Sequence, residues 1–246
     1  MDVALACKLY RIYADDLRGV IEQQRAFLAA NQGRVTPQLD DVEAELTYLA
    51  LREYQPRTVM ELGTFHGWST TWILSALRDN GRGHLHSFDR IDNVVCTVPP
   101  ALSWDRWTFV HGNIAARLDA VPDDLDYLFV DADHGRRFGR WYLANLFPRV
   151  APGTPVSVHD VFHGRRARPW SEGAEVMRWL DERGVPWFTA ARRHARANLA
   201  AIDEVRAELG LTGARGTTVN PMIFFRLPES VGDRTSGTAP RRRGTR

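Results

Sequence analysis

The sequence predicts an α/β protein with a doubly wound, mostly parallel sheet of seven strands. Two observations predict this class. Short apolar segments alternate with helical segments from about residue 57 onward, and the 246-residue chain is long enough for one large domain. Strands separated by helices form βαβ units, which bury a parallel sheet between two layers of helices.

A helical region is predicted over residues 1–54, ahead of the first strand. Apolar residues recur there near helical spacing, and the pair Asp40-Asp41 is a start signal for its last helix. We expect this region to act as a lid over the pocket or as a contact in a homodimer. The apolar positions are Leu5, Leu9, Ile12, Leu17, Val20, Ile21, Leu46, Leu49 and Ala50.

The alternating part of the chain, residues 55–229, is predicted to be the catalytic or binding domain. Helices are expected near residues 68–78, 114–119, 136–147, 172–183 and 195–209, between the strands. The strands themselves are predicted over residues 58–62, 84–89, 107–111, 126–131, 155–159, 186–190 and 221–227.

Composition excludes several classes of protein. Hydrophobic residues make up 44% and charged residues 25% of the chain, as in ordinary globular enzymes. No apolar run approaches the roughly 20 residues of a membrane span. We expect no signal peptide, because the start lacks a basic segment followed by a long apolar one. Only Cys7 and Cys96 are present, which indicates a reducing compartment and a cytoplasmic location.

The positive net charge comes from the end of the chain. Residues 230–246 contain five of the 32 basic and one of the 30 acidic residues, so the rest has 27 basic and 29 acidic side chains. The body of the protein is therefore not a basic nucleic-acid binder. The composition of residues 230–246 predicts a disordered basic tail.

The segment Val59–Thr70 reads as an apolar strand, a glycine turn and the start of a helix. Its glycines, Gly63 and Gly67, are spaced Gly-x-x-x-Gly, whereas a dinucleotide pyrophosphate site has Gly-x-Gly-x-x-Gly. Glycines allow a ligand to approach the main chain closely, and backbone N–H groups at a helix start attract negative charge. Glu61 at the strand end favours a ligand with a cationic or hydroxyl-bearing part.

This segment resembles the first motif of S-adenosylmethionine-dependent methyltransferases, in the Glu-x-Gly-x-x-x-Gly-x-Ser form of the catechol O-methyltransferase-like branch. The resemblance implies a Rossmann-like class I fold and S-adenosylmethionine as the cofactor. The residues it assigns to cofactor binding are Glu61, Gly63, Thr64, Phe65, Gly67, Ser69, Asp89, Arg90, Asn113, Ile114 and Asp131.

Two of these positions have a plainer interpretation as well. Asp89 ends a strand 28 residues after Glu61, where an acid accepts both hydroxyls of a ribose or caps the next turn. Asn113-Ile114 follows the third strand, in the region that flanks adenine in the family. Gly112-Asn113 is also an ordinary turn pair.

A second group of polar residues follows the fourth and fifth strands. Asp131 ends the fourth strand, and His159 and Asp160 end the fifth, beside it at the same edge of the sheet. Carboxylates and imidazoles are ligands of divalent cations, so Asp131, His159 and Asp160 form a candidate metal site. His134, three residues after Asp131, is a candidate general base, although a structural histidine is the common alternative.

The same layout is similar to the metal-dependent O-methyltransferases. In that family an Asp on the fourth strand binds Mg²⁺, a basic residue three positions later takes the acceptor proton, and an acidic pair after the fifth strand completes the site. Asp131, His134 and Asp160 match this pattern, and a histidine as base resembles the sugar-modifying members. His159 departs from it, since that position usually carries an acid.

The resemblance implies an enzyme that methylates a hydroxyl of a small molecule, a sugar or another natural product, with a divalent metal such as Mg²⁺. One alternative keeps the cofactor and drops the metal, with His134 as base for a carboxylate or nitrogen acceptor. Another is a nicotinamide enzyme or a non-catalytic module, and the absent Gly-x-Gly-x-x-Gly disfavours the nicotinamide enzyme. The Asp131-Ala132-Asp133-His134 run lacks the Pro-Pro signature of enzymes that methylate nucleic-acid bases.

Overall fold

A computed structural model describes residues 1–217 and 219–229, which include a seven-stranded sheet in the order β3-β2-β1-β4-β5-β7-β6. Strands β1 to β5 are parallel to one another, and β7 is antiparallel to both β5 and β6. The predicted doubly wound, mostly parallel fold is confirmed. The strands are β1 Thr58–Leu62, β2 His84–Asp89, β3 Trp107–His111, β4 Tyr127–Val130, β5 Pro155–Val158, β6 Trp187–Phe188 and β7 Ile223–Arg226.

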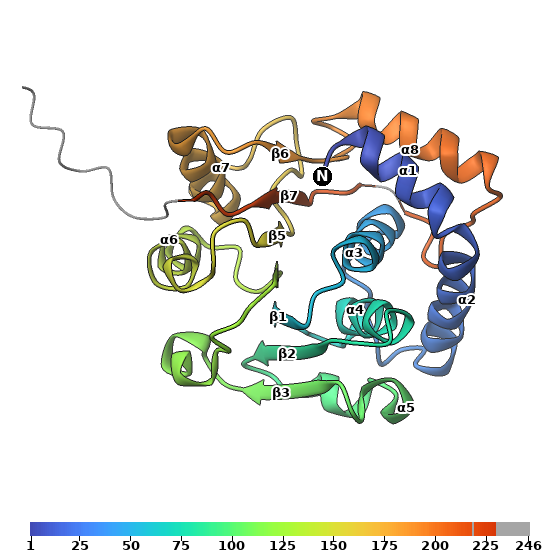
Figure 1. Ribbon diagram of the computed structural model, residues 1–246, viewed down its shortest axis with the longest axis horizontal. Coiled ribbons are helices and arrows are strands. Elements are labelled where there is room, and N and C mark those ends of the chain that lie inside the picture. Colours follow the sequence, from blue (N-terminus) through green and yellow to red (C-terminus); the bar gives the residue numbers. More distant parts are fainter. Residues whose placement is uncertain (218, 230–246) are drawn as a thin grey trace, which may run out of the picture.

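Helices cover both faces of the sheet (Figure 1). α3 and α4 lie on one side, with α1, α2 and α8 outside them, and α6 and α7 lie on the other. The helices are α1 Val3–Ile12, α2 Ala14–Ala30, α3 Asp41–Tyr54, α4 Trp68–Asp79, α5 Pro100–Ser103, α6 Arg136–Asn145, α7 Glu172–Arg183 and α8 Arg196–Glu208. Four short 3₁₀ segments are η1 Asn93–Cys96, η2 Ile114–Ala116, η3 Leu118–Ala120 and η4 Phe147–Arg149.

Several elements differ from the prediction at their ends. The helix expected near 114–119 is two short 3₁₀ segments, η2 and η3. The strand expected over 186–190 has only two residues, because the Thr189 hydroxyl binds the Met222 carbonyl and accepts from the Ala191 N–H. A short helix that the sequence did not predict, α5, begins at Pro100, as the fixed φ of proline permits at a first helical position.

The N-terminal helices belong to the main hydrophobic core. Leu9 of α1, Leu46 of α3, Trp72 of α4 and Ile202 of α8 are all fully buried in one cluster. α3 begins with a capping box in which Asp40 and Glu43 bind each other's backbone N–H groups. Residues 1–54 therefore pack as a layer of the domain, and their proposed lid or dimer role stays a prediction.

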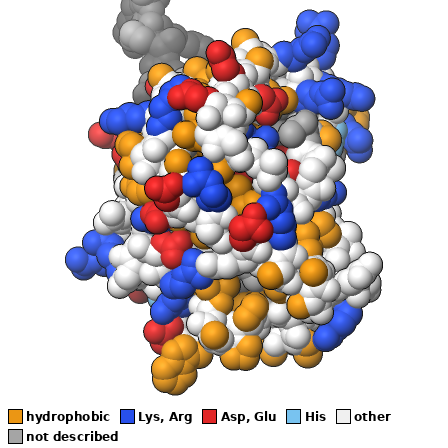
Figure 2. Space-filling model, turned by 90° about the vertical axis from the view of Figure 1, so that its right-hand side faces the viewer, with side chains coloured by type: hydrophobic (Ala, Val, Ile, Leu, Met, Phe, Trp, Pro, Cys, Tyr) orange, Lys and Arg blue, Asp and Glu red, His pale blue; other side chains and the backbone are white. Residues whose placement is uncertain are grey.

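The outer face of these helices carries charges of both signs, intermingled in Figure 2. Arg11 pairs with Glu208, Arg18 with Asp15, and Arg25 with Glu22. Among the described residues, no helix has the length and apolar character that crossing a bilayer requires. The predicted basic tail, residues 230–246, lies outside the described residues.

Candidate active site

A cavity of about 810 Å³ opens at the carboxyl ends of β1 to β4, where open parallel sheets hold their ligands. It is lined by the β1–α4 turn, by the segments that follow β2, β3 and β4, and by the α2–α3 loop. The lining residues include Thr36, Gln38, Gly63, Thr64, Phe65, Ser69, Asp89, Arg90, Asn113, Ile114, Asp131, His134, Arg137, Phe138 and Trp141.

The turn after β1 depends on its two glycines. Gly63 has a φ of +84°, and a Cβ there would lie 1.9 Å from the carbonyl oxygen of Asp131. Gly67 has a φ of +83° at the residue that precedes α4, and does not itself line the cavity. These left-handed conformations favour glycine, so the Gly-x-x-x-Gly spacing shapes the floor of the cavity.

Asp89 ties this turn to the end of β2. Its Oδ2 accepts hydrogen bonds from the backbone N–H groups of Thr64, at 2.7 Å, and Phe65, at 2.9 Å. Its Oδ1 accepts one from the Ile91 N–H at 3.1 Å. Asp89 lines the cavity and fixes the turn as well, so the two interpretations of this acid are compatible.

The structure places Glu61 beneath the cavity and not on its wall. Its carboxylate is fully buried and accepts hydrogen bonds from Ser69 at 2.6 Å, Thr70 at 2.9 Å and Ser87 at 2.6 Å. Burial raises the pKa of Glu61 to about 7. Glu61 thus does not line the cavity and joins β1, β2 and α4 under the turn, while its role in cofactor binding stays a prediction.

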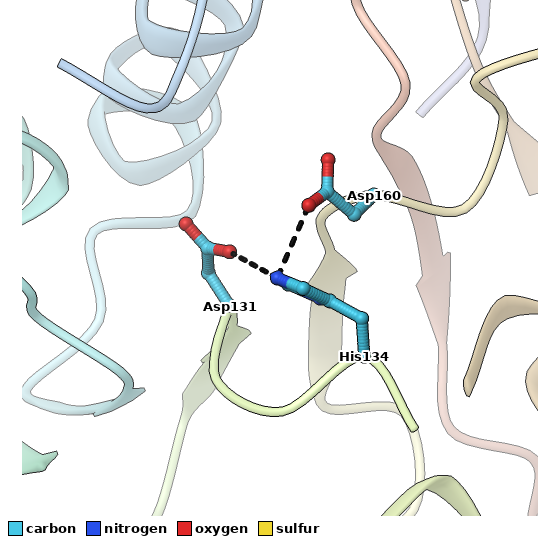
Figure 3. Close-up of side chains that lie close together, drawn as sticks. All are labelled: Asp131, His134 and Asp160. Carbon is cyan, nitrogen blue, oxygen red and sulfur yellow. Dashed lines mark ion pairs between the residues drawn. The ribbon is translucent and has the colours of Figure 1, made fainter. Parts of the chain in front are cut away.

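Asp131, His134 and Asp160 converge after β4 and β5 (Figure 3), and the first two of them line the cavity. His134 Nε2 lies 3.1 Å from Asp160 Oδ2 and 4.0 Å from Asp131 Oδ1. One ligand atom from each of the three residues lies within 4.8 Å of the other two. The side chain of His134 is 46% exposed, so a small molecule in the cavity has access to it.

His159 does not join that group as the sequence predicted. It is only 5% exposed, with Nδ1 3.0 Å from Asp131 Oδ1 and Nε2 3.2 Å from Glu43 Oε2. Burial alone would lower the pKa of His159, but these two carboxylates raise it well above its usual value. Both ring nitrogens of His159 already face carboxylates. The geometry therefore favours a charged His159 that holds Asp131 in place over a His159 that binds a metal.

Two site residues were missed from the sequence, Glu43 and Glu172. Glu172 Oε2 lies 3.4 Å from His134 Nδ1, and Glu43 contacts His159. The hydrogen bond to Glu172 raises the pKa of His134 against the effect of burial, and Asp160 and Asp131 raise it further. The only signal for Glu43 was its place three residues after Asp40, which identifies a helix cap and no role in a site.

Comparison with known proteins agrees with the fold. Residues 60–161 match the model of a family described as a methyltransferase domain. The cofactor-bound protein Rv0187 from MTB has 18% identity and a TM-score of 0.59, with 83% of this chain and 88% of that chain covered. No curated protein sequence matches the chain.

Two further solved structures are similar. A putative caffeoyl-CoA O-methyltransferase from Staphylococcus aureus has 15% identity and a TM-score of 0.56, covering 85% of this chain and 91% of that one. An O-methyltransferase from Bacillus cereus, in complex with SAH, has 15% identity and a TM-score of 0.54, covering 86% and 90%.

Sheet order, glycine turn and matched domain together define the class of protein. Residues 60–161 match a methyltransferase domain, and the chain has the fold of class I S-adenosylmethionine-dependent methyltransferases, as the sequence predicted.

Proposed function

We propose that this methyltransferase transfers the methyl group of S-adenosylmethionine to a hydroxyl of a small molecule, with His134 as the general base. The observation that carries the proposal is one cavity whose lining includes the glycine turn with Asp89, here called the cofactor end, and Asp131 with His134, here called the acceptor end. Two of the similar structures are described as O-methyltransferases or putative ones, which supports an oxygen acceptor.

The cofactor end of the cavity fits a sulfonium nucleoside. Asp89, Asn113 and Ile114 all line the cavity. The proposal assigns the ribose hydroxyls to the Asp89 carboxylate and the adenine to Asn113 and Ile114. The main chain at Gly63 and Thr64 can approach the amino-acid part closely, because Gly63 has no side chain. Arg90 and Phe65 complete this end.

The reaction is an in-line displacement. The acceptor oxygen forms a bond to the methyl carbon while the carbon–sulfur bond breaks, which leaves S-adenosylhomocysteine and removes the sulfonium charge. The acceptor's hydroxyl proton passes to His134 Nε2, the ring nitrogen that faces Asp131 and Asp160. The protein mainly positions the two reactants and removes this proton.

A divalent cation fits beside the base. Mg²⁺ is usually held by one or two carboxylates together with water, and Asp131 and Asp160 bring two carboxylates to the edge of the cavity. When bound, such an ion lowers the pKa of a hydroxyl that it touches. Since His134 Nε2 cannot bind the ion and take the proton at once, the proposal assigns the ion to the two aspartates.

A metal-independent reaction is the second candidate. It is favoured by His159, whose raised pKa keeps its ring positively charged. Nδ1 of this ring lies 3.0 Å from Asp131 Oδ1. Because that charge already neutralises one of the two carboxylates, it weakens their attraction for a cation. In this case His134 would act alone on the acceptor, which could be a hydroxyl, a carboxylate or a nitrogen.

The test uses the full chain, labelled S-adenosylmethionine and a panel of sugar, catechol and other hydroxylated acceptors. We expect label transfer to at least one hydroxyl, lost after chelation and restored by Mg²⁺. Activity that survives exhaustive chelation would support the metal-independent candidate. Calorimetry that shows no binding of S-adenosylhomocysteine would overturn both. A sugar or other natural-product acceptor is the class that we propose to test first.

A further inference from the structure

Glu172 is a buried carboxylate that the proposed reaction does not use. It is the first residue of α7 and is 2% exposed. Its Oε2 lies 3.4 Å from His134 Nδ1, and its Oε1 has no hydrogen-bond partner among the described residues. Burial of a carboxylate destabilises the folded state unless hydrogen bonds or a positive charge compensate for the lost hydration. The location of Glu172 beside His134 therefore calls for an explanation.

The backbone fixes the same pair of residues. The Glu172 N–H donates to the His134 carbonyl oxygen at 2.9 Å, and Gly135 and Ser171 form a β-bridge next to it. A Cβ on Gly139 of α6 would lie 3.1 Å from the Glu172 Cα. The loop that carries His134 and the start of α7 are therefore held together by main-chain contacts and by close packing.

The orientation of the His134 ring follows from this arrangement. Nδ1 faces Glu172, whereas Nε2 faces Asp160 at 3.1 Å and Asp131 at 4.0 Å. Carboxylates face both nitrogens, but Asp160 also faces His159 Nδ1 at 3.3 Å and His163 Nε2 at 3.0 Å, and Asp131 faces His159 Nδ1 at 3.0 Å. Among the described residues, Glu172 faces no histidine ring other than that of His134. A neutral imidazole has a single N–H, and the carboxylate that no other histidine shares places this hydrogen on Nδ1. The other nitrogen then keeps its lone pair.

We propose that Glu172 is a positioning residue for His134: it accepts the Nδ1–H, and so leaves Nε2 as the proton acceptor that faces the reacting hydroxyl. The inference rests on the proposed role of His134 as base. Glu172 does not line the cavity. It acts through the imidazole, in the way that outer carboxylates fix the tautomer of metal-binding and catalytic histidines.

The test compares Glu172→Gln and Glu172→Ala with the wild-type chain. The amide of Glu172→Gln keeps the size of the side chain and can donate to Nδ1 as easily as accept from it. We expect kcat to fall about 10- to 100-fold in both variants, with the KM for S-adenosylmethionine unchanged. Glu175→Gln is the matched control, because Glu175 lies one turn along α7 and pairs with Arg136, Arg140 and Arg178.

A spectroscopic readout separates this proposal from the proposed function. Long-range ¹H–¹⁵N spectra of the S-adenosylhomocysteine complex, recorded where the ring is neutral, should show His134 with hydrogen on Nδ1 in the wild type. Both ring forms should appear in Glu172→Gln. An unchanged ring form, or a kcat loss equal to that of Glu175→Gln, would overturn the role of Glu172. Full activity of His134→Ala would instead overturn the base.

Discussion

The two ends of the cavity use carboxylates in opposite ways. At the cofactor end, Glu61 and Asp89 accept hydrogen bonds from hydroxyl and backbone N–H donors, all within 30 residues of them in the chain. At the acceptor end, Asp131 and Asp160 face the ring nitrogens of His134 and His159. The cofactor end is held by hydrogen bonds between residues that are close in the sequence. The acceptor end is a group of ionisable side chains whose charges change when a proton moves.

Loss of the base should give the largest effect. In His134→Ala we expect turnover to fall about 10²- to 10⁴-fold, because no other group at the acceptor end replaces Nε2. Binding of S-adenosylhomocysteine, measured by calorimetry, should stay within a few-fold of wild type, since His134 follows β4 whereas Asp89, the proposed ribose contact, ends β2. A parallel loss of cofactor affinity would mean that the two ends are not separate.

His163→Ala is the matched control for that experiment. His163 Nε2 lies 3.0 Å from Asp160 Oδ1, but His163 does not line the cavity. We expect this variant to keep most of its turnover. If it loses as much as His134→Ala, the base has been assigned to the wrong histidine.

Glu61 should make folding stability depend on pH. Because its pKa in the folded protein is raised to about 7 from 4.5, the folded state holds the proton more tightly than the unfolded state does. The stabilisation from this proton is fully present below pH 4.5 and is lost as the pH rises through 7. The linkage relation gives roughly 2–3 kcal/mol between pH 5 and pH 8.

Urea unfolding at the two pH values measures this effect. Glu61→Gln cannot ionise, so its free energy of unfolding should change less between pH 5 and pH 8 than that of the wild type. Asp40, whose pKa burial also raises to about 7, is present in both chains and cancels in the difference. Equal pH dependence in the two chains would contradict the buried, protonated state of Glu61.

The Asp89→Asn substitution tests the cofactor end of the cavity. One side-chain oxygen becomes an amide nitrogen, so the variant loses acceptors for the Thr64, Phe65 and Ile91 N–H groups or for the ribose. We expect the cofactor to bind more weakly by about 1–3 kcal/mol. The rate at saturating S-adenosylmethionine should stay near that of the wild type. A lower rate with unchanged affinity would place Asp89 at the wrong end.

The cofactor end was largely predictable because its parts are close in sequence. Gly63 and Gly67 are needed for turn geometry that few other residues adopt, so the local pattern identifies the turn. The same pattern did not show that Glu61 would be covered by Ser69, Thr70 and Ser87. The sequence pattern around an acid at the end of a strand is the same whether its side chain points into the cavity or lies beneath it.

The acceptor end was only partly predictable. Asp131, His134 and Asp160 follow from the rule that parallel strands end at the same edge of a sheet, and the structure brings them together. The packing of His159 against Glu43 and of His134 against Glu172 was not predictable. It depends on Glu43 of α3 and Glu172 of α7, which lie far from either histidine in the chain or on a different element.

The sequence by itself determined the class of fold, the glycine turn and the strand-end acids, because each follows from spacing along the chain. Only the tertiary structure decided which groups each ring nitrogen of His134 and His159 faces, since that depends on carboxylates brought from two helices on opposite sides of the sheet. The physical reason is that hydrogen bonds fix a ring by short contacts in space, and periodicity along the chain does not encode such contacts.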